Sequence, residues 1–163
     1  MAQRVRNQPA LVGWSAALGV SLDEVKTAWE DLQRRGLVAT KRGKVTVSPL
    51  TMRRATTDVQ RRLAAHLLGY LLTENPYIVR RAGDPPSLAY ILNTRFSVEH
   101  IASYFKEGWG VTDIQRDLHL LTREEIEAAI QYYLNHREEI ERGLQRSREL
   151  YEEHAPKRET MPV

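Results

Sequence analysis

The chain contains no cysteine and no apolar run long enough to cross a membrane. Among 163 residues, the absence of cysteine excludes disulfides, thiolate nucleophiles, iron–sulfur clusters and thiolate zinc sites. The longest apolar stretch, residues 64–72, carries His66 and is far shorter than the roughly 20 residues that span a bilayer. We therefore predict no membrane partner. A cysteine-free chain also suits the reducing cytoplasm, which is the expected location.

Motifs of the common enzyme classes are missing as well. The sequence has no phosphate-binding loop, no Gly-x-Ser-x-Gly nucleophile elbow and no dinucleotide fingerprint. Paired carboxylates, as at Glu124–Glu125 and Glu138–Glu139, follow patterns typical of solvated helix faces. The five histidines lack metal-ligand spacing. We therefore expect neither an enzyme nor a protein that holds a cofactor or a metal ion.

The charge that is present is unevenly distributed. Residues 1–62 hold 12 Lys and Arg against 5 Asp and Glu, a net charge of +7. Residues 63–163 hold 12 against 16, a net charge of −4, and the two parts together give the formal +3 of the chain. This asymmetry suggests a polyanion-binding end joined to a protein-binding end. Chance asymmetry between solvated faces is the alternative.

The N-terminal part shows the order helix, turn, helix and two-stranded hairpin. Apolar residues recur at helical spacing over 11–18, and the capping box Ser21-x-x-Glu24 starts a second helix. Gly36 is placed to end that helix in the left-handed conformation. Two β-prone pieces then flank a basic tip, Lys-Arg-Gly-Lys at 41–44. This order is the layout of a winged helix-turn-helix.

The remaining sequence also predicts a mainly helical structure. We expect one helix over residues 51–74, because its apolar residues share a side and Asn75-Pro76 ends it. Two strands, near 77–79 and 88–92, are joined by a Gly-Asp-Pro-Pro turn. Three later helices begin at capping residues. The predicted starts are Ser97, the capping box Thr112–Gln115 and the capping box Thr122–Glu125.

The last helix is predicted to continue to about Glu153 as one long element. Its apolar seam alternates spacings of four and three, as in a coiled coil, through Ile126, Ile130, Tyr133, Arg137, Ile140 and Leu144. The predicted fold class is mainly α: an N-terminal winged helix-turn-helix, then a helix-turn-helix-like domain with a short β-hairpin and a long final helix. The predicted boundaries are 1–50 for the first domain, 51–76 for a connecting helix, 77–154 for the second domain and 155–163 for a flexible tail.

The segment 18–38, together with the basic tip at 41–44, resembles bacterial winged-helix repressors of the GntR kind. The resemblance lies in the two helices, in Gly36-Leu37 and in the hairpin, whereas Leu22 stands where that family usually carries an arginine. The resemblance implies that the second helix enters the major groove of DNA and that the hairpin contacts the phosphate backbone. A winged helix used only for protein contacts is the alternative. The predicted DNA contacts are Ser21, Lys26, Thr27, Arg34, Arg35, Lys41, Arg42 and Lys44.

Residues 77–142 resemble the family catalogued as domain of unknown function 433, a VapB-type antitoxin family. The matching pieces include Tyr77-Ile-Val-Arg80, the stretch 89–98 and the final-helix signature at 128–140. The resemblance implies a small helical, DNA-binding-like domain that is usually dimeric. It also implies the antitoxin half of a toxin–antitoxin pair whose toxin is a PIN-like ribonuclease.

Two further groups of residues follow from this segment. Asn93 stands at the position where the family has a glycine at the corner between strand and helix, and asparagine tolerates positive φ. With Thr94 and Arg95 it forms a predicted structural corner, which Arg95 is expected to tie together through carbonyls or a carboxylate. The predicted contacts with a second copy or with the toxin are Ile130, Tyr133, Ile140, Leu144 and Tyr151.

We therefore expect a DNA-binding antitoxin of a type II toxin–antitoxin pair. It would bind double-stranded DNA, repress its own operon, neutralise a PIN-like ribonuclease toxin and form a homodimer. Two other functions stay open at this point. One is a winged-helix transcriptional regulator without a toxin, and the other is a protein–protein adaptor that does not bind DNA.

Overall fold

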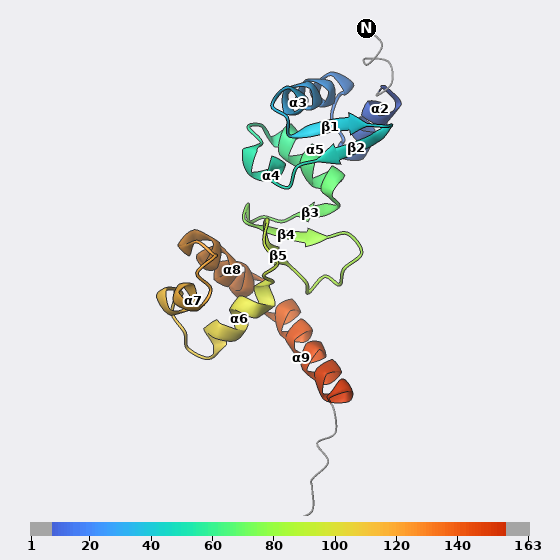
Figure 1. Ribbon diagram of the computed structural model, residues 1–163. Coiled ribbons are helices and arrows are strands. Elements are labelled where there is room, and N and C mark those ends of the chain that lie inside the picture. Colours follow the sequence, from blue (N-terminus) through green and yellow to red (C-terminus); the bar gives the residue numbers. More distant parts are fainter. Residues whose placement is uncertain (1–7, 156–163) are drawn as a thin grey trace, which may run out of the picture. The chain divides into compact units, whose positions relative to one another are not determined.

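The computed structural model describes residues 8–155, and these form a mainly helical protein with small antiparallel sheets (Figure 1). The chain divides into two compact units between Leu72 and Thr73. Each unit has its own cluster of buried apolar side chains. Residues 1–7 and 156–163, which include most of the predicted tail, lie outside the described part. Across residues 8–155, no helix has both the length and the apolar character needed to cross a membrane.

The N-terminal unit begins with α2 (Gln8–Leu18) and α3 (Leu22–Arg34). The predicted capping box at the start of α3 is confirmed: the Ser21 hydroxyl accepts the Glu24 amide at 3.2 Å, and the Glu24 carboxylate accepts the Ser21 amide at 2.9 Å. The helices pack through one apolar face each. The buried members of this cluster are Leu11, Val25, Ala28, Trp29, Leu32, Leu37, Val38 and Leu63.

The predicted hairpin is also present. Strands β1 (Val38–Lys41) and β2 (Lys44–Val47) pair antiparallel. Lys41 faces Lys44 across the pair, so only Arg42 and Gly43 make the turn. Both turn residues have positive φ, 50° and 75°, as a tight two-residue hairpin turn requires. Figure 1 shows this hairpin beside α3 and α5 of the same unit.

The prediction of a single helix over residues 51–74 is wrong. The chain instead forms α4 (Thr51–Arg54), α5 (Asp58–Leu68) and a short strand, β3 (Tyr70–Leu72). A new helix starts at Asp58 because the Thr57 side chain caps it by accepting the Gln60 amide at 3.2 Å. It ends where Gly69 takes the left-handed conformation, at φ 74°. Apolar spacing alone did not reveal either interruption.

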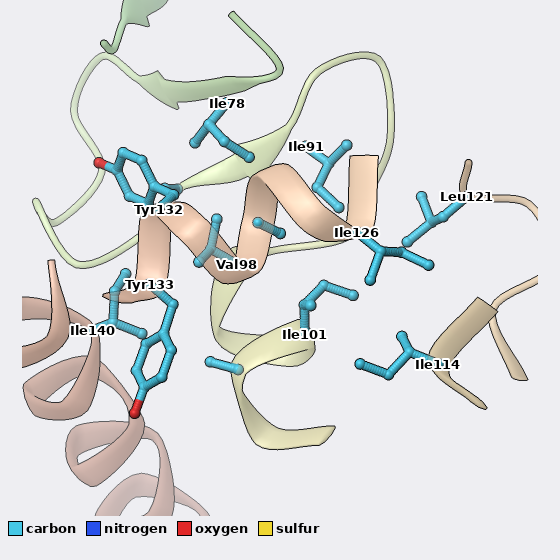
Figure 2. Packing of buried hydrophobic residues seen from close by; sticks show 13 residues of the cluster. Ile78, Ile91, Val98, Ile101, Ile114, Leu121, Ile126, Tyr132, Tyr133 and Ile140 are labelled. Carbon is cyan, nitrogen blue, oxygen red and sulfur yellow. The ribbon is translucent and has the colours of Figure 1, made fainter. Parts of the chain in front are cut away.

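The C-terminal unit opens with a small hairpin and continues as helices. Strands β4 (Ile78–Arg81) and β5 (Tyr90–Ile91) pair antiparallel, and the second strand is shorter than predicted. Helices α6 (Val98–Lys106), α7 (Val111–Asp117) and α8 (Arg123–Asn135) follow. Figure 2 shows their shared core. Its labelled members are Ile78, Ile91, Val98, Ile101, Ile114, Leu121, Ile126, Tyr132, Tyr133 and Ile140.

Two of the three predicted helix starts in this unit are confirmed. Ser97 caps α6, and Thr122 caps α8 with a reciprocal bond from Glu125. The prediction of a capping box at Thr112 is wrong, because the N-cap of α7 is Gly110, two residues earlier, and Thr112 lies inside the helix. Gly110 has no side chain to offer, so the α7 N-terminus has no side-chain cap bond.

The predicted long final helix is interrupted. α8 ends at Asn135, and a separate helix, α9 (Arg137–His154), follows after His136. The His136 ring stacks on Tyr132 at 4.2 Å between centroids, and its Nε2 contacts the Glu74 carboxylate. The predicted continuous coiled-coil seam is therefore split between two helices.

Candidate nucleic-acid interface

The strongest electrostatic feature lies in the N-terminal unit. Between Asp31 and Asp58 the sequence contains no Asp or Glu, whereas it holds seven Lys and Arg residues. The segment runs from the end of α3 through the hairpin and α4. Such a stretch carries positive charge that no neighbouring carboxylate in the sequence offsets, and this pattern fits a polyanion.

The hairpin tip presents three of these cations to solvent. Lys41, Arg42 and Lys44 are all exposed. Within the described chain, none of the three forms an ion pair with a carboxylate. A free ammonium or guanidinium at the end of a narrow hairpin can approach a phosphate without moving another group. All three residues are among the DNA contacts predicted from the sequence.

The outward face of α3 has the opposite electrostatic character. Lys26 and Thr27 are exposed there, as a base-reading role requires. However, α3 holds four acidic residues against two basic ones, so its net charge is −2. Asp23 and Glu30 are exposed on the same helix. The predicted contact Ser21 is occupied in the helix cap, where its hydroxyl also donates to the Glu24 carboxylate at 2.8 Å.

The end of α3 is organised by a buried glutamine. Gln60 donates to the Asp31 carboxylate at 2.8 Å and accepts the Thr56 amide at 2.9 Å. This hydrogen bond, then those from Arg35 and the charge of Arg34, hold the pKa of Asp31 below its usual value. Gln60 thus joins α3 to α5. Apolar periodicity carries no signal for such a polar contact, so the contact of Gln60 with Asp31 was not among the predictions.

Arg34 and Arg35, both predicted to contact DNA, differ in their surroundings. Arg34 pairs with Asp31 at 3.0 Å, yet its side chain is 73% exposed and can reach a ligand. Arg35 pairs with Asp31 at 3.3 Å and also donates to the carbonyl of Arg54. Arg35 also donates to the side-chain oxygen of Gln60 at 3.4 Å, so it holds the start of α5 and the end of α4 against α3. Its guanidinium is already used within the fold.

The same contact reveals two further cations, which are not among the predicted DNA contacts. Because Arg35 binds the Arg54 carbonyl, α4 lies at the C-terminal end of α3. Arg53 and Arg54 are exposed on α4, at the same end as Arg34. The acid-free segment 32–57 would have pointed to them. The basic surface of this unit thus has two parts, the hairpin tip and the α3–α4 corner.

The predicted corner in the C-terminal unit is stabilised by a different residue from the one expected. Asn93 has φ 59°, so its tolerance of the left-handed region is used. Thr94, rather than Arg95, ties the corner: its hydroxyl donates to the Ile91 carbonyl at 2.8 Å and accepts the Phe96 amide at 3.1 Å. Arg95 is exposed, and its guanidinium lies 6.0 Å from the Phe96 ring.

Most of the residues predicted to contact a partner instead build the core of their own unit. Tyr133 is 3% exposed and Ile140 is 1% exposed, and Figure 2 shows them side by side. Ile130 and Leu144 pack partly buried against the same cluster. After the break at His136, the first turns of α9 pack against α6. Of the predicted set, only Tyr151 is freely exposed, at 77%.

The Tyr133 hydroxyl also fixes α9. It donates to the Glu141 carboxylate at 2.5 Å, and Lys106 of α6 pairs with the same carboxylate at 2.6 Å. Burial, followed by this hydrogen bond, raises the pKa of Tyr133. The bonds from Lys106 and Tyr133 lower the pKa of Glu141. This ionic contact therefore has a structural role in the unit.

A buried carboxylate marks the crossing of α6 and α9. Glu99 is 8% exposed, and burial raises its pKa, an effect that a hydrogen bond with Ser147 partly offsets. Gly143 of α9 crosses here without a side chain. A Cβ at that position would collide with the Glu99 carboxylate and would lie 2.8 Å from the Cβ of Ser87. Gly143 thus sets the close approach of the two helices.

Comparison with known proteins adds one family. The model of the family described as "Protein of unknown function (DUF433)" matches residues 88–133. This stretch runs from just before β5 to Tyr133 in α8, and the match supports assigning that segment to the family. No curated protein and no solved structure matches the chain.

Proposed function

We propose that the protein is a DNA-binding regulator rather than an enzyme, with its N-terminal unit on duplex DNA. The observation that carries this proposal is a set of exposed cations at the hairpin tip, Lys41, Arg42 and Lys44, which form no ion pair within residues 8–155 and lie in an acid-free segment. Neutralising phosphates with Lys and Arg supplies most sequence-independent affinity for DNA. The α3–α4 corner, with exposed Arg34, Arg53 and Arg54, adds a second group of cations in the same unit.

In this proposal α3 and the hairpin have separate tasks. The net charge of −2 on α3 makes that helix a poor source of phosphate affinity. Its exposed Lys26 and Thr27 are suited instead to contacts with base edges in the major groove. Asp23 and Glu30 would repel phosphate, so they disfavour any DNA site at which they face the backbone. The hairpin supplies affinity, and α3 supplies discrimination.

A salt titration tests the hairpin directly. Replacing Lys41, Arg42 and Lys44 with alanine should weaken DNA binding and should flatten the plot of log affinity against log salt, by about 0.9 for each lost phosphate contact. The matched control is R95A/R116A/R148A, which removes the same charge from exposed positions of the C-terminal unit. Fluorescence anisotropy over a range of salt concentrations gives both slopes. Equal slopes for the two triple variants would rule out the hairpin as the DNA-binding element.

The match at residues 88–133, together with the resemblance in the sequence, supports a more specific proposal. In it, the protein is an antitoxin that neutralises a PIN-like ribonuclease and represses its own operon. The net charge of −4 on residues 73–163 suits the basic surface with which a ribonuclease holds RNA. Co-expression of the full chain with a ribonuclease encoded beside it should restore growth. The hairpin triple variant should protect equally well, because its lost cations lie in the other unit.

The two remaining candidates predict different results in the same pair of assays. A regulator without a toxin would bind DNA with the slope described above and would give no protection against the ribonuclease. A protein–protein adaptor would show neither effect. DNA binding and protection together are therefore required for the antitoxin proposal.

A further inference from the structure

One side of α9 is left uncovered by the rest of its unit. Ile140, Gly143 and Leu144 pack toward α6 and the core, all on one side of the helix. Beyond them the side chains of residues 145–154 are exposed, and Figure 1 shows this end of α9 extending past α6. The side opposite the core carries exposed charges. We call Arg142, Arg146, Glu149 and Glu153 the α9 charge stripe.

The stripe follows from helical geometry. At about 100° per residue, these four side chains lie within about 60° of one another around the helix axis. Ile140 and Leu144 lie roughly 160° away from Arg142. The stripe therefore points away from the unit and is open along its whole length. Within the described chain none of its four members forms an ion pair, and Glu149 accepts only a hydrogen bond from Gln145, at 2.9 Å.

The order of charges along the stripe is complementary to itself when reversed. Arg142 and Arg146 precede its midpoint, which falls between Ser147 and Arg148, and Glu149 and Glu153 follow it at the same distances. We propose that the stripe binds the same stripe of a second copy, with the two α9 helices antiparallel. Arg142 then meets Glu153 of the second copy, and Arg146 meets Glu149. The two-fold symmetry repeats both contacts.

A parallel arrangement would instead place like charges opposite each other. Within one helix, Arg142 and Arg146 are like charges four residues apart, as are Glu149 and Glu153, and such pairs repel. An antiparallel partner offsets both repulsions. Leu150 is 50% exposed at the edge of the stripe, where it can pack on the aliphatic stem of Arg146 from the second copy.

The expected dimer is weak and sensitive to salt. Ion pairs between exposed side chains contribute little individually and are screened by salt. Sedimentation equilibrium of the full chain should show a dimer at low salt that dissociates as salt rises. The variants R142E/R146E and E149R/E153R should each weaken dimerisation at least tenfold. Combining all four changes restores complementarity and should restore the dimer, as should mixing the two double variants.

Cysteine cross-linking tests the orientation, since the chain has no cysteine of its own. R142C and E153C should form a disulfide when mixed under oxidising conditions, and neither should cross-link to itself. A parallel pair would give the reverse result. That result would overturn the proposal, as would a wild-type monomer at all concentrations in low salt or a fourfold variant that stays monomeric while fully helical. None of these readouts depends on DNA or on a toxin, so the inference stands apart from the proposed function.

Discussion

At the tip of the hairpin, Arg42 adopts a conformation that its side chain does not favour. Its φ of 50° and the 75° of Gly43 give the two positive values of a type I′ turn, for which Asn-Gly is the preferred pair. An arginine in this place lowers turn stability in exchange for a cation at the outermost point of the strand pair. A requirement for positive charge at the hairpin tip, as in DNA binding, would explain why arginine stands there.

The substitution Arg42→Asn therefore separates stability from binding. We expect the free energy of unfolding to stay the same or to rise by up to about 1 kcal/mol, because asparagine tolerates positive φ better. DNA affinity should fall, and the salt slope should decrease by about 0.9. Urea unfolding and anisotropy titrations give the two quantities. Arg42→Lys keeps the charge and serves as the control. Unchanged binding by the asparagine variant would show that Arg42 does not contact phosphate.

Gly143 offers a second test at the scale of one residue. An added Cβ would lie 2.8 Å from the Cβ and 2.9 Å from the Oγ of Ser87, and would press on the buried carboxylate of Glu99. Gly143→Ala should lower the free energy of unfolding by about 1–3 kcal/mol through overpacking, even though alanine favours a helix. Thermal unfolding checks this. The matched control is Gly13→Ala in α2, where a Cβ lies within 4 Å of no other part of the described structure and should stabilise the helix.

At the scale of the helix and strand, one sequence pattern had two outcomes. Thr112 and Thr122 each precede an acidic or amide side chain by three residues, so both predict a capping box. Only Thr122 caps a helix, whereas the α7 start is set by Gly110 and by the packing of Val111 and Ile114. The local pattern is the same, and tertiary packing decides between the two cases.

Alanine substitutions should show this difference in one unfolding transition, since both threonines lie in the C-terminal unit. Thr122→Ala removes a side chain that accepts the Glu125 amide at 3.2 Å and should cost about 1 kcal/mol. Thr112→Ala should change the free energy of unfolding by less than half of that, because no cap is lost. Chemical unfolding followed by circular dichroism measures both. A comparable loss at Thr112 would mean that its hydroxyl stabilises α7 after all.

The break between α8 and α9 could not be predicted from the sequence. The seam through Ile130, Tyr133, Ile140 and Leu144 has the spacing of a single helix, and that spacing correctly identifies apolar positions. It does not show that the helix breaks at His136 and that the first turns of α9 pack on α6, so residues expected at an interface lie in the core. The polar contacts that fix the turn, such as Glu74 with His136, join positions far apart in the sequence. No local pattern predicts them.

At the scale of the whole molecule, charge and structure divide the chain at nearly the same place. The change from net positive to net negative at residue 62 lies close to the division between Leu72 and Thr73. The hairpin, both helices before it and the basic tip were predictable because capping, turn and charge signals agree there. The two buried clusters share no residue, so each unit has a core of its own.

This separation leads to the last prediction. A fragment of residues 1–72 keeps its entire apolar cluster, from Leu11 to Leu63, and all the cations assigned to DNA. We expect it to fold by itself, by circular dichroism, and to bind duplex DNA with the salt slope of the full chain. The fragment 73–163 carries a net charge of −4 and should not bind at physiological salt. DNA binding by the second fragment, or a slope for the first that is smaller by more than about 0.9, would place phosphate contacts in the C-terminal unit.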